Sequence, residues 1–82
     1  MKLLILGAGK MGTFFCDLLS PEHQVAVYDP NPDRLRFTYG VERSDDLNQV
    51  DAFGAEMVIN AATVRHTLDA FRQVMPHIPA NC

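Results

Sequence analysis

Short runs of consecutive apolar residues alternate along this chain with segments in which apolar residues recur at helical spacing. These runs are residues 3–6 (LLIL) and 25–28 (VAVY), and the similar segment 57–61 (MVINA) is apolar apart from Asn60. Runs of this length predict strands that are buried on both faces of a parallel sheet. A brief further strand is predicted over 41–43.

The segments that follow the first and last runs predict helices with one apolar face. The first of these helices stops at residues 20–21 (SP), and the last begins at Thr63 as its cap and ends at Pro76. The apolar face of the first helix is formed by Met11, Phe14, Phe15, Leu18 and Leu19. The apolar stripe of the last helix, which we interpret as core, is formed by Val64, Leu68, Phe71 and Met75.

Two shorter helices are predicted from their capping residues. Residues 31–33 (NPD) supply an N-cap, a proline at the first helical position and an acid in the first turn. This helix is predicted to run toward Tyr39 and to close on Gly40. Ser44 is the predicted cap of another helix over 45–53, which the following glycine ends.

The alternation of strands and helices through short connections predicts the fold class. It is an α/β fold with an open parallel sheet and helices on both faces, for which the doubly wound pattern gives the strand order 3-2-1-4. A single motif joins the first strand to the first helix: Gly7, Ala8, Gly9, Lys10, Met11 and Gly12, which together read G-x-G-x-x-G. A glycine motif that follows a buried strand and opens an amphipathic helix is typical of a Rossmann-type dinucleotide site.

Each glycine of the motif has a separate physical reason. Gly7 permits the tight turn out of the strand, Gly9 lets a pyrophosphate approach the backbone, and Gly12 lets the helix pack close to the sheet. The helix N-terminus offers unpaired N–H groups and a positive dipole end to the phosphates. A glycine-rich turn that binds nothing is the alternative interpretation.

Asp29 strengthens the dinucleotide interpretation. It lies 17 residues beyond Gly12, at the end of the second predicted strand. A carboxylate there accepts hydrogen bonds from the ribose hydroxyls of an adenosine and repels a 2′-phosphate, so NAD is expected in preference to NADP. Arg34 follows on the first turn of the next helix, where we interpret it as a solvated residue.

Composition and charge exclude several other classes of function. The net charge is −3, and the seven basic residues are scattered, which argues against nucleic acid as a partner. No apolar run approaches the length that spans a membrane, and the first run is too short and too soon interrupted for a signal peptide. Cys16 and Cys82 lack metal-ligand spacing, so we expect a reduced, cytoplasmic protein.

No catalytic residue and no metal site is predicted. The three histidines, His23, His66 and His77, are far apart in sequence, and His66 is interpreted as an exposed helix-start residue. Cys16 is interpreted as a small buried hydrophobe rather than a reactive thiol. The neighbouring acids at 45–46 suit a helix start, and Lys10 is interpreted as facing solvent.

Three stretches of this chain together resemble the N-terminal NAD-binding part of prephenate dehydrogenase. They are MKLLILGAGKMGTFFCDLL, VAVYDPNPDRLRF and MVINAATVRHTLDAF, in the family's order of elements. That family oxidatively decarboxylates prephenate to 4-hydroxyphenylpyruvate in tyrosine biosynthesis. The resemblance implies that Ala61, Ala62 and Thr63 lie along the cofactor, although the proline common in that loop is missing here.

The resemblance also implies that residues 1–82 are the N-terminal part of a longer NAD-binding domain. In the family, further strands complete the sheet, a catalytic histidine lies beyond this point, and a helical second domain builds the substrate pocket and the homodimer. The run over 57–61 would otherwise be an apolar sheet edge that pairs with another chain. We therefore expect a fragment that is inactive alone, with its small-molecule substrate bound by the missing region.

Two alternatives stay open at this point. The glycine motif and Asp29 also resemble those of pyrroline-5-carboxylate reductase and of hydroxyacid dehydrogenases. A stand-alone NAD-sensing regulatory module would need the same cofactor site and no catalytic residues, and fold alone does not separate it from an enzyme fragment.

Overall fold

A computed structural model describes the chain except residues 37, 63–66 and 81–82. Its described part holds a parallel sheet of four strands, in the order β3-β2-β1-β4. The strands are β1 (Lys2–Leu6), β2 (Gln24–Tyr28), β3 (Glu42–Ser44) and β4 (Met57–Asn60). The predicted fold class and strand order are therefore confirmed.

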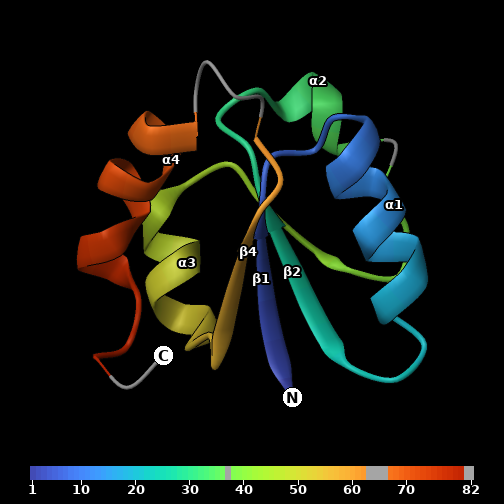
Figure 1. Ribbon diagram of the computed structural model, residues 1–82, viewed down its shortest axis with the longest axis horizontal. Coiled ribbons are helices and arrows are strands. Elements are labelled where there is room, and N and C mark those ends of the chain that lie inside the picture. Colours follow the sequence, from blue (N-terminus) through green and yellow to red (C-terminus); the bar gives the residue numbers. More distant parts are fainter. Residues whose placement is uncertain (37, 63–66, 81–82) are drawn as a thin grey trace.

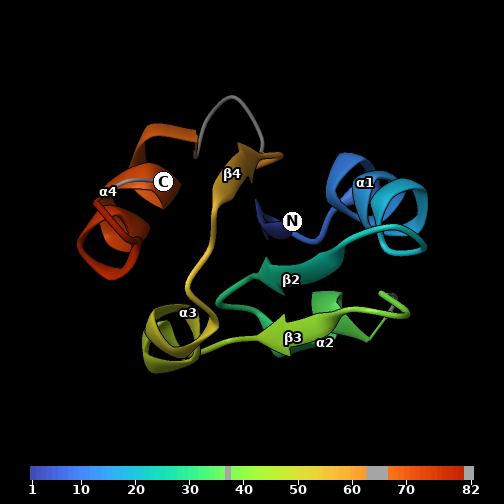
Figure 2. The same ribbon diagram turned by 90° about the horizontal axis from the view of Figure 1, so that it is seen from below.

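Helices cover both faces of this sheet, with α1 and α2 on one face and α3 and α4 on the other (Figures 1 and 2). The four helices are α1 (Lys10–Leu19), α2 (Pro32–Leu35), α3 (Leu47–Phe53) and α4 (Thr67–Val74). A short 3-10 turn, η1 (Met75–His77), continues α4.

Alternate side chains of the central strand enter two separate cores. Leu4 and Leu6 of β1 pack with residues of α3 and α4, including the buried Val50 and Val74. Leu3 and Ile5 face the opposite way and pack with residues of α1 and α2, including Cys16 and Leu35. Because β1 is buried on both sides, its sequence is continuously apolar.

The second helix is shorter than predicted. It ends at Leu35, and the prediction that it runs toward Tyr39 was wrong. The Thr38 backbone N–H and side-chain hydroxyl both donate to the Leu35 carbonyl, at 3.1 and 2.6 Å. These bonds close the chain into a turn, and Thr38 is fully buried there.

The third helix begins later than predicted, because Asp46 rather than Ser44 is its cap. The Asp46 carboxylate accepts from the Asn48 backbone N–H at 2.8 Å, while Ser44 is the last residue of β3. The third strand accordingly lies one residue further along than the predicted 41–43. Gly54 ends the helix in the left-handed region, as predicted, with φ of 64°.

The buried face of α1 differs from the predicted one. Phe15 and Leu19 pack against the core as predicted, but Met11, Phe14 and Leu18 are 56%, 54% and 60% exposed. The fully inward positions are Gly12 and Cys16. A Cβ on Gly12 would overlap the Gly7 carbonyl, so this close contact turns the small residue inward and rotates the larger ones out.

The apolar stripe predicted for the last helix was partly wrong. Phe71 packs against the core, but Met75 is 59% exposed, and Val74 occupies the buried position instead. Val64, the predicted cap Thr63 and the side chain of Leu68 lie outside the described part of the chain.

Candidate functional site at the carboxyl edge of the sheet

A cavity of about 380 Å³ opens where the parallel strands end. In an open α/β sheet, ligands bind outside the carboxyl ends of the strands, where the order of the strands reverses. Here that reversal falls at β1, which has β2 on one side and β4 on the other. The residues that line the cavity and are used below are Gly7, Gly9, Tyr28, Asp29, Asn31, Arg34, Ala61, Ala62, Asp69 and Gln73.

Two glycines of the motif that follows β1 are required by the protein itself. Gly7 has a φ of +94°, and a Cβ added to it would lie 3.1 Å from the Ala62 backbone. Its N–H donates to the Tyr28 carbonyl at 2.8 Å, which ties the loop to β2. Gly12 lies against the Gly7 carbonyl, with no room for a side chain. Internal packing is therefore a sufficient reason for glycine at both positions.

Gly9 is different, because nothing in the described chain requires a glycine there. A Cβ at this position would meet no protein atom within 4 Å, and its φ of −77° is open to any residue. Gly9 is exposed, lines the cavity and is the N-cap of α1. No side chain of a described residue caps this helix end, so none of those side chains accepts from its first N–H groups.

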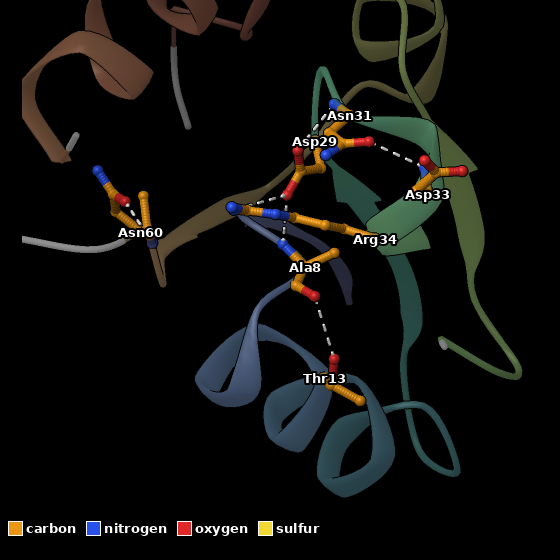
Figure 3. A network of polar contacts seen from close by, with 8 residues as sticks. Ala8, Thr13, Asp29, Asn31, Asp33, Arg34 and Asn60 are labelled. Carbon is orange, nitrogen blue, oxygen red and sulfur yellow. Dashed lines mark hydrogen bonds and ion pairs between the residues drawn. The ribbon is translucent and has the colours of Figure 1, made fainter. Parts of the chain in front are cut away.

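Asp29 is held inside a network of backbone donors, drawn in Figure 3. Its Oδ2 accepts from the Ala8 N–H at 3.0 Å, and its Oδ1 accepts from the Asn31 N–H at 2.9 Å. Asp29 is only 4% exposed. A carboxylate offers about four lone-pair positions, so each oxygen keeps acceptor capacity beyond these bonds. Sequence reasoning placed Asp29 at this edge but missed its bond to the glycine loop.

Arg34 lies across the same network in Figure 3, with its guanidinium beside Asp29. Its Nη1 is 3.9 Å from the Asp29 Oδ2, and its side chain is 58% exposed. The Asn31 side chain accepts from the Asp33 N–H at 3.0 Å and thereby caps α2, the helix that carries Arg34. Arg34 is exposed to solvent, as interpreted from the sequence, and it also lines the cavity, which the sequence did not indicate.

The loop after β4 forms the other side of the cavity. The Ala61 N–H donates to the Leu6 carbonyl at 2.9 Å, and the Ala62 N–H donates to the Asn60 side-chain oxygen at 3.0 Å. Asn60 was not singled out from the sequence, although an asparagine that follows a strand often bonds to the backbone two residues on. Thr63, the third residue predicted for this loop, lies outside the described residues.

The structure thus brings together five of the predicted cofactor residues around the cavity: Gly7, Gly9, Asp29, Ala61 and Ala62. Ala8 lies buried behind them, and Gly12 is buried in α1. Lys10 and Met11 are exposed on the first turn of α1, and neither is among the described lining residues. Asp69 and Gln73 of α4 were missed, because their distance from the motif in sequence gives no signal.

Other titratable groups lie away from this cavity or are held in one protonation state. Burial, and then the carboxylate of Asp29, raises the pKa of the Tyr28 phenol, which keeps its hydroxyl protonated. His77 contacts the Asp51 carboxylate at 2.7 Å and joins η1 to α3. Within the described residues there is no cluster of three potential metal ligands. None of the helices described is long and apolar enough to cross a membrane.

The fold and the placement of this cavity define a Rossmann-like α/β structure. Among solved structures, the chain is similar to prephenate dehydrogenase from A. aeolicus, in complex with hydroxyphenyl propionate and NAD+. The match has a TM-score of 0.83 and 20% sequence identity, and it covers 100% of this chain and 31% of that one. At this identity the likeness is one of fold. No protein-family model matches the sequence, and no curated protein matches it.

Proposed function

We propose that this chain binds NAD at the carboxyl edge of its sheet, as the cofactor-binding portion of an NAD-dependent dehydrogenase. The complete enzyme we propose is similar to prephenate dehydrogenase and converts prephenate to 4-hydroxyphenylpyruvate in tyrosine biosynthesis. The fold match to an NAD+ complex supports the cofactor, and the three sequence stretches above support the reaction. The substrate, the catalytic base and the contacts of a homodimer are assigned to parts of the enzyme outside these 82 residues, and the enzyme to the cytoplasm.

The observation that carries the proposal is the glycine at position 9. Gly7 and Gly12 are explained by packing, but Gly9 has open space where a Cβ would be and an ordinary backbone conformation. The space beside it is the cavity itself. A ligand that approaches the backbone closely supplies the missing reason, and a pyrophosphate is attracted to a helix N-terminus of this kind.

The cavity residues fit the separate parts of a dinucleotide. Gly9 and the first N–H groups of α1 would hold the pyrophosphate, and the remaining lone pairs of Asp29 would accept from the adenosine ribose. Ala61, Ala62 and Thr63 would lie along the cofactor, as the family resemblance implies. When bound, NAD supplies the hydride acceptor, and the role of these residues is to fix its position.

A Cβ at position 9 tests the proposal directly. We expect Gly9→Ala to weaken NADH binding at least about tenfold, because the methyl group would occupy the space of the pyrophosphate. The same substitution should leave the thermal melt nearly unchanged, since it meets no protein atom. Binding is measured by NADH fluorescence titration, and folding by circular dichroism.

Gly54→Ala is the matched control. It adds the same methyl group into open space at the end of α3, far from the cavity lining, but at a φ of +64°. We expect it to cost about 1 kcal/mol of stability and to retain NADH affinity. Equal NADH affinity in the unmodified chain and in Gly9→Ala would contradict the proposed site, and no binding by the unmodified chain would contradict the function.

A further inference from the structure

Arg34 is the one cation among the described residues that line the cavity. It belongs to α2, which begins directly after the loop that follows Asp29. Its guanidinium lies beside Asp29, at the end of β2 (Figure 3). The Asn31 cap and the proline at the first helical position fix the start of α2, so the place of Arg34 is set by the local fold.

The two charged groups at this end of the cavity differ in what they present to a ligand. The Asp29 side chain is 5% exposed, and both of its oxygens already accept backbone N–H groups. The Arg34 side chain is 58% exposed, and its ion pair among the described residues is the long 3.9 Å approach to Asp29. An incoming molecule therefore meets a guanidinium first, with a carboxylate enclosed behind it.

We propose that Arg34 binds the 2′-phosphate of NADP, so that the site accepts NADP as well as NAD. This inference rests on the proposed function and revises the preference for NAD that Asp29 alone predicts. The repulsion between the Asp29 carboxylate and a 2′-phosphate is offset by a positive charge beside both groups. A guanidinium has a planar fork of donors that matches a phosphate, and its position beside Asp29 limits the conformational freedom it loses on binding.

Two carboxylates near this end of the cavity weaken the attraction of Arg34 for a 2′-phosphate without reversing it. Asp69 of α4 lines the opposite wall of the cavity, and Asp33 of α2 is exposed beside Asn31. Among the described residues, the acid within ion-pair distance of Arg34 is Asp29. We therefore expect comparable affinities for the two cofactors rather than a strong selection for NADP.

The test compares the dissociation constants for NADH and NADPH at one fixed ionic strength. In the unmodified chain we expect the two constants to agree within about tenfold. Arg34→Ala should raise the ratio of the NADPH constant to the NADH constant by about tenfold or more, because it removes the donor to the 2′-phosphate. Arg34→Lys, which keeps the charge but loses the fork, should give an intermediate ratio.

Arg72→Ala is the matched control. It removes the same charge from an exposed position on α4 that is not among the described lining residues, and it should leave the ratio unchanged. NADPH binding should also weaken more steeply with salt than NADH binding, and this difference should disappear in Arg34→Ala.

The possible outcomes separate the two proposals. If NADH binds and the ratio does not change in Arg34→Ala, or changes equally in Arg72→Ala, the role of Arg34 is overturned while the proposed function stands. If the unmodified chain binds NADH at least a hundredfold more tightly than NADPH, the inference is overturned as well. If neither cofactor binds, the proposed function fails and this inference fails with it.

Discussion

Asp29 shows how one residue serves both the fold and the candidate site. Its bond to the Ala8 N–H joins the end of β2 to the glycine loop, and its bond to the Asn31 N–H shapes the turn into α2. A buried N–H that loses its acceptor costs about 1–3 kcal/mol. Removal of this carboxylate would therefore change the loop as well as any contact with a ribose, which is why the tests above act on Gly9 and Arg34.

The buried thiol of Cys16 predicts how the stability of the chain depends on pH. Burial, and then the nearby charge of Asp17, raises the pKa of this thiol from 9.0 to about 11. The unfolded chain therefore loses the thiol proton at lower pH than the folded chain, so stability falls as pH rises from 9 toward 11. We expect the free energy of unfolding to be about 1 kcal/mol lower at pH 10 than at pH 8 because of this group.

Urea unfolding at the two pH values measures this loss, in a Cys82→Ser background so that only one thiol titrates. Cys16→Ala in the same background is the control, because it removes the titrating group and leaves the raised pKa of Tyr28 in place. The same dependence on pH in both variants would show that Cys16 is not the cause.

At the scale of the element, the rotation of α1 is set by one close contact. Gly12 lies against the Gly7 carbonyl, and this contact turns Cys16 and Phe15 toward the sheet. Hydrophobic periodicity alone does not distinguish this orientation from one rotated toward Met11 and Phe14. The smallest residue of the helix, rather than the largest, decides which face is buried.

Two neighbouring phenylalanines of α1 test this rotation with the same chemical change. Phe15→Ala should cost about 2–3 kcal/mol, because it leaves a cavity under the helix. Phe14→Ala should cost less than about 1 kcal/mol, since Phe14 is 54% exposed and loses mainly its edge contact with the Phe15 ring. Urea unfolding of the two variants measures both values, and equal losses would contradict the observed rotation.

At the scale of the whole molecule, β4 is an edge of the sheet in the described part of the chain. Its burial contrasts with that of the central strand: Met57 is 47% exposed, and the other three residues are half-buried. An apolar edge strand is a template for pairing with another chain. Self-association of the isolated chain through β4, inferred from the sequence, therefore stays a prediction.

Sedimentation equilibrium tests that prediction with two variants, each of which places one lysine on a different exposed apolar surface. We expect the chain to associate with rising concentration, and Met57→Lys to weaken this at least about fivefold, because a lysine on an edge opposes strand pairing. Met11→Lys makes the same change on α1, where Met11 is 56% exposed, and should have little effect. The opposite result would assign the association to α1.

The pattern of residues by itself determined the class of fold, the strand order and the edge of the sheet at which the candidate site lies. The class of fold and this edge depend on local properties: continuous apolar runs make buried strands, capping residues and glycines end the helices, and parallel strands place their carboxyl ends together. The strand order follows from the doubly wound pattern that the glycine motif indicates. Gly7, Gly9 and Asp29 were found because each follows directly from a strand end.

Only the tertiary structure decided which side chains meet across that edge. The pairing of Asp29 with Ala8 and the arrival of Asp69 and Gln73 from α4 join segments that lie far apart in sequence. The inward face of α1 was decided in the same way, by a contact between a glycine and a carbonyl. Packing at this level depends on the shape and distance of nonlocal neighbours, which periodicity and capping signals do not carry.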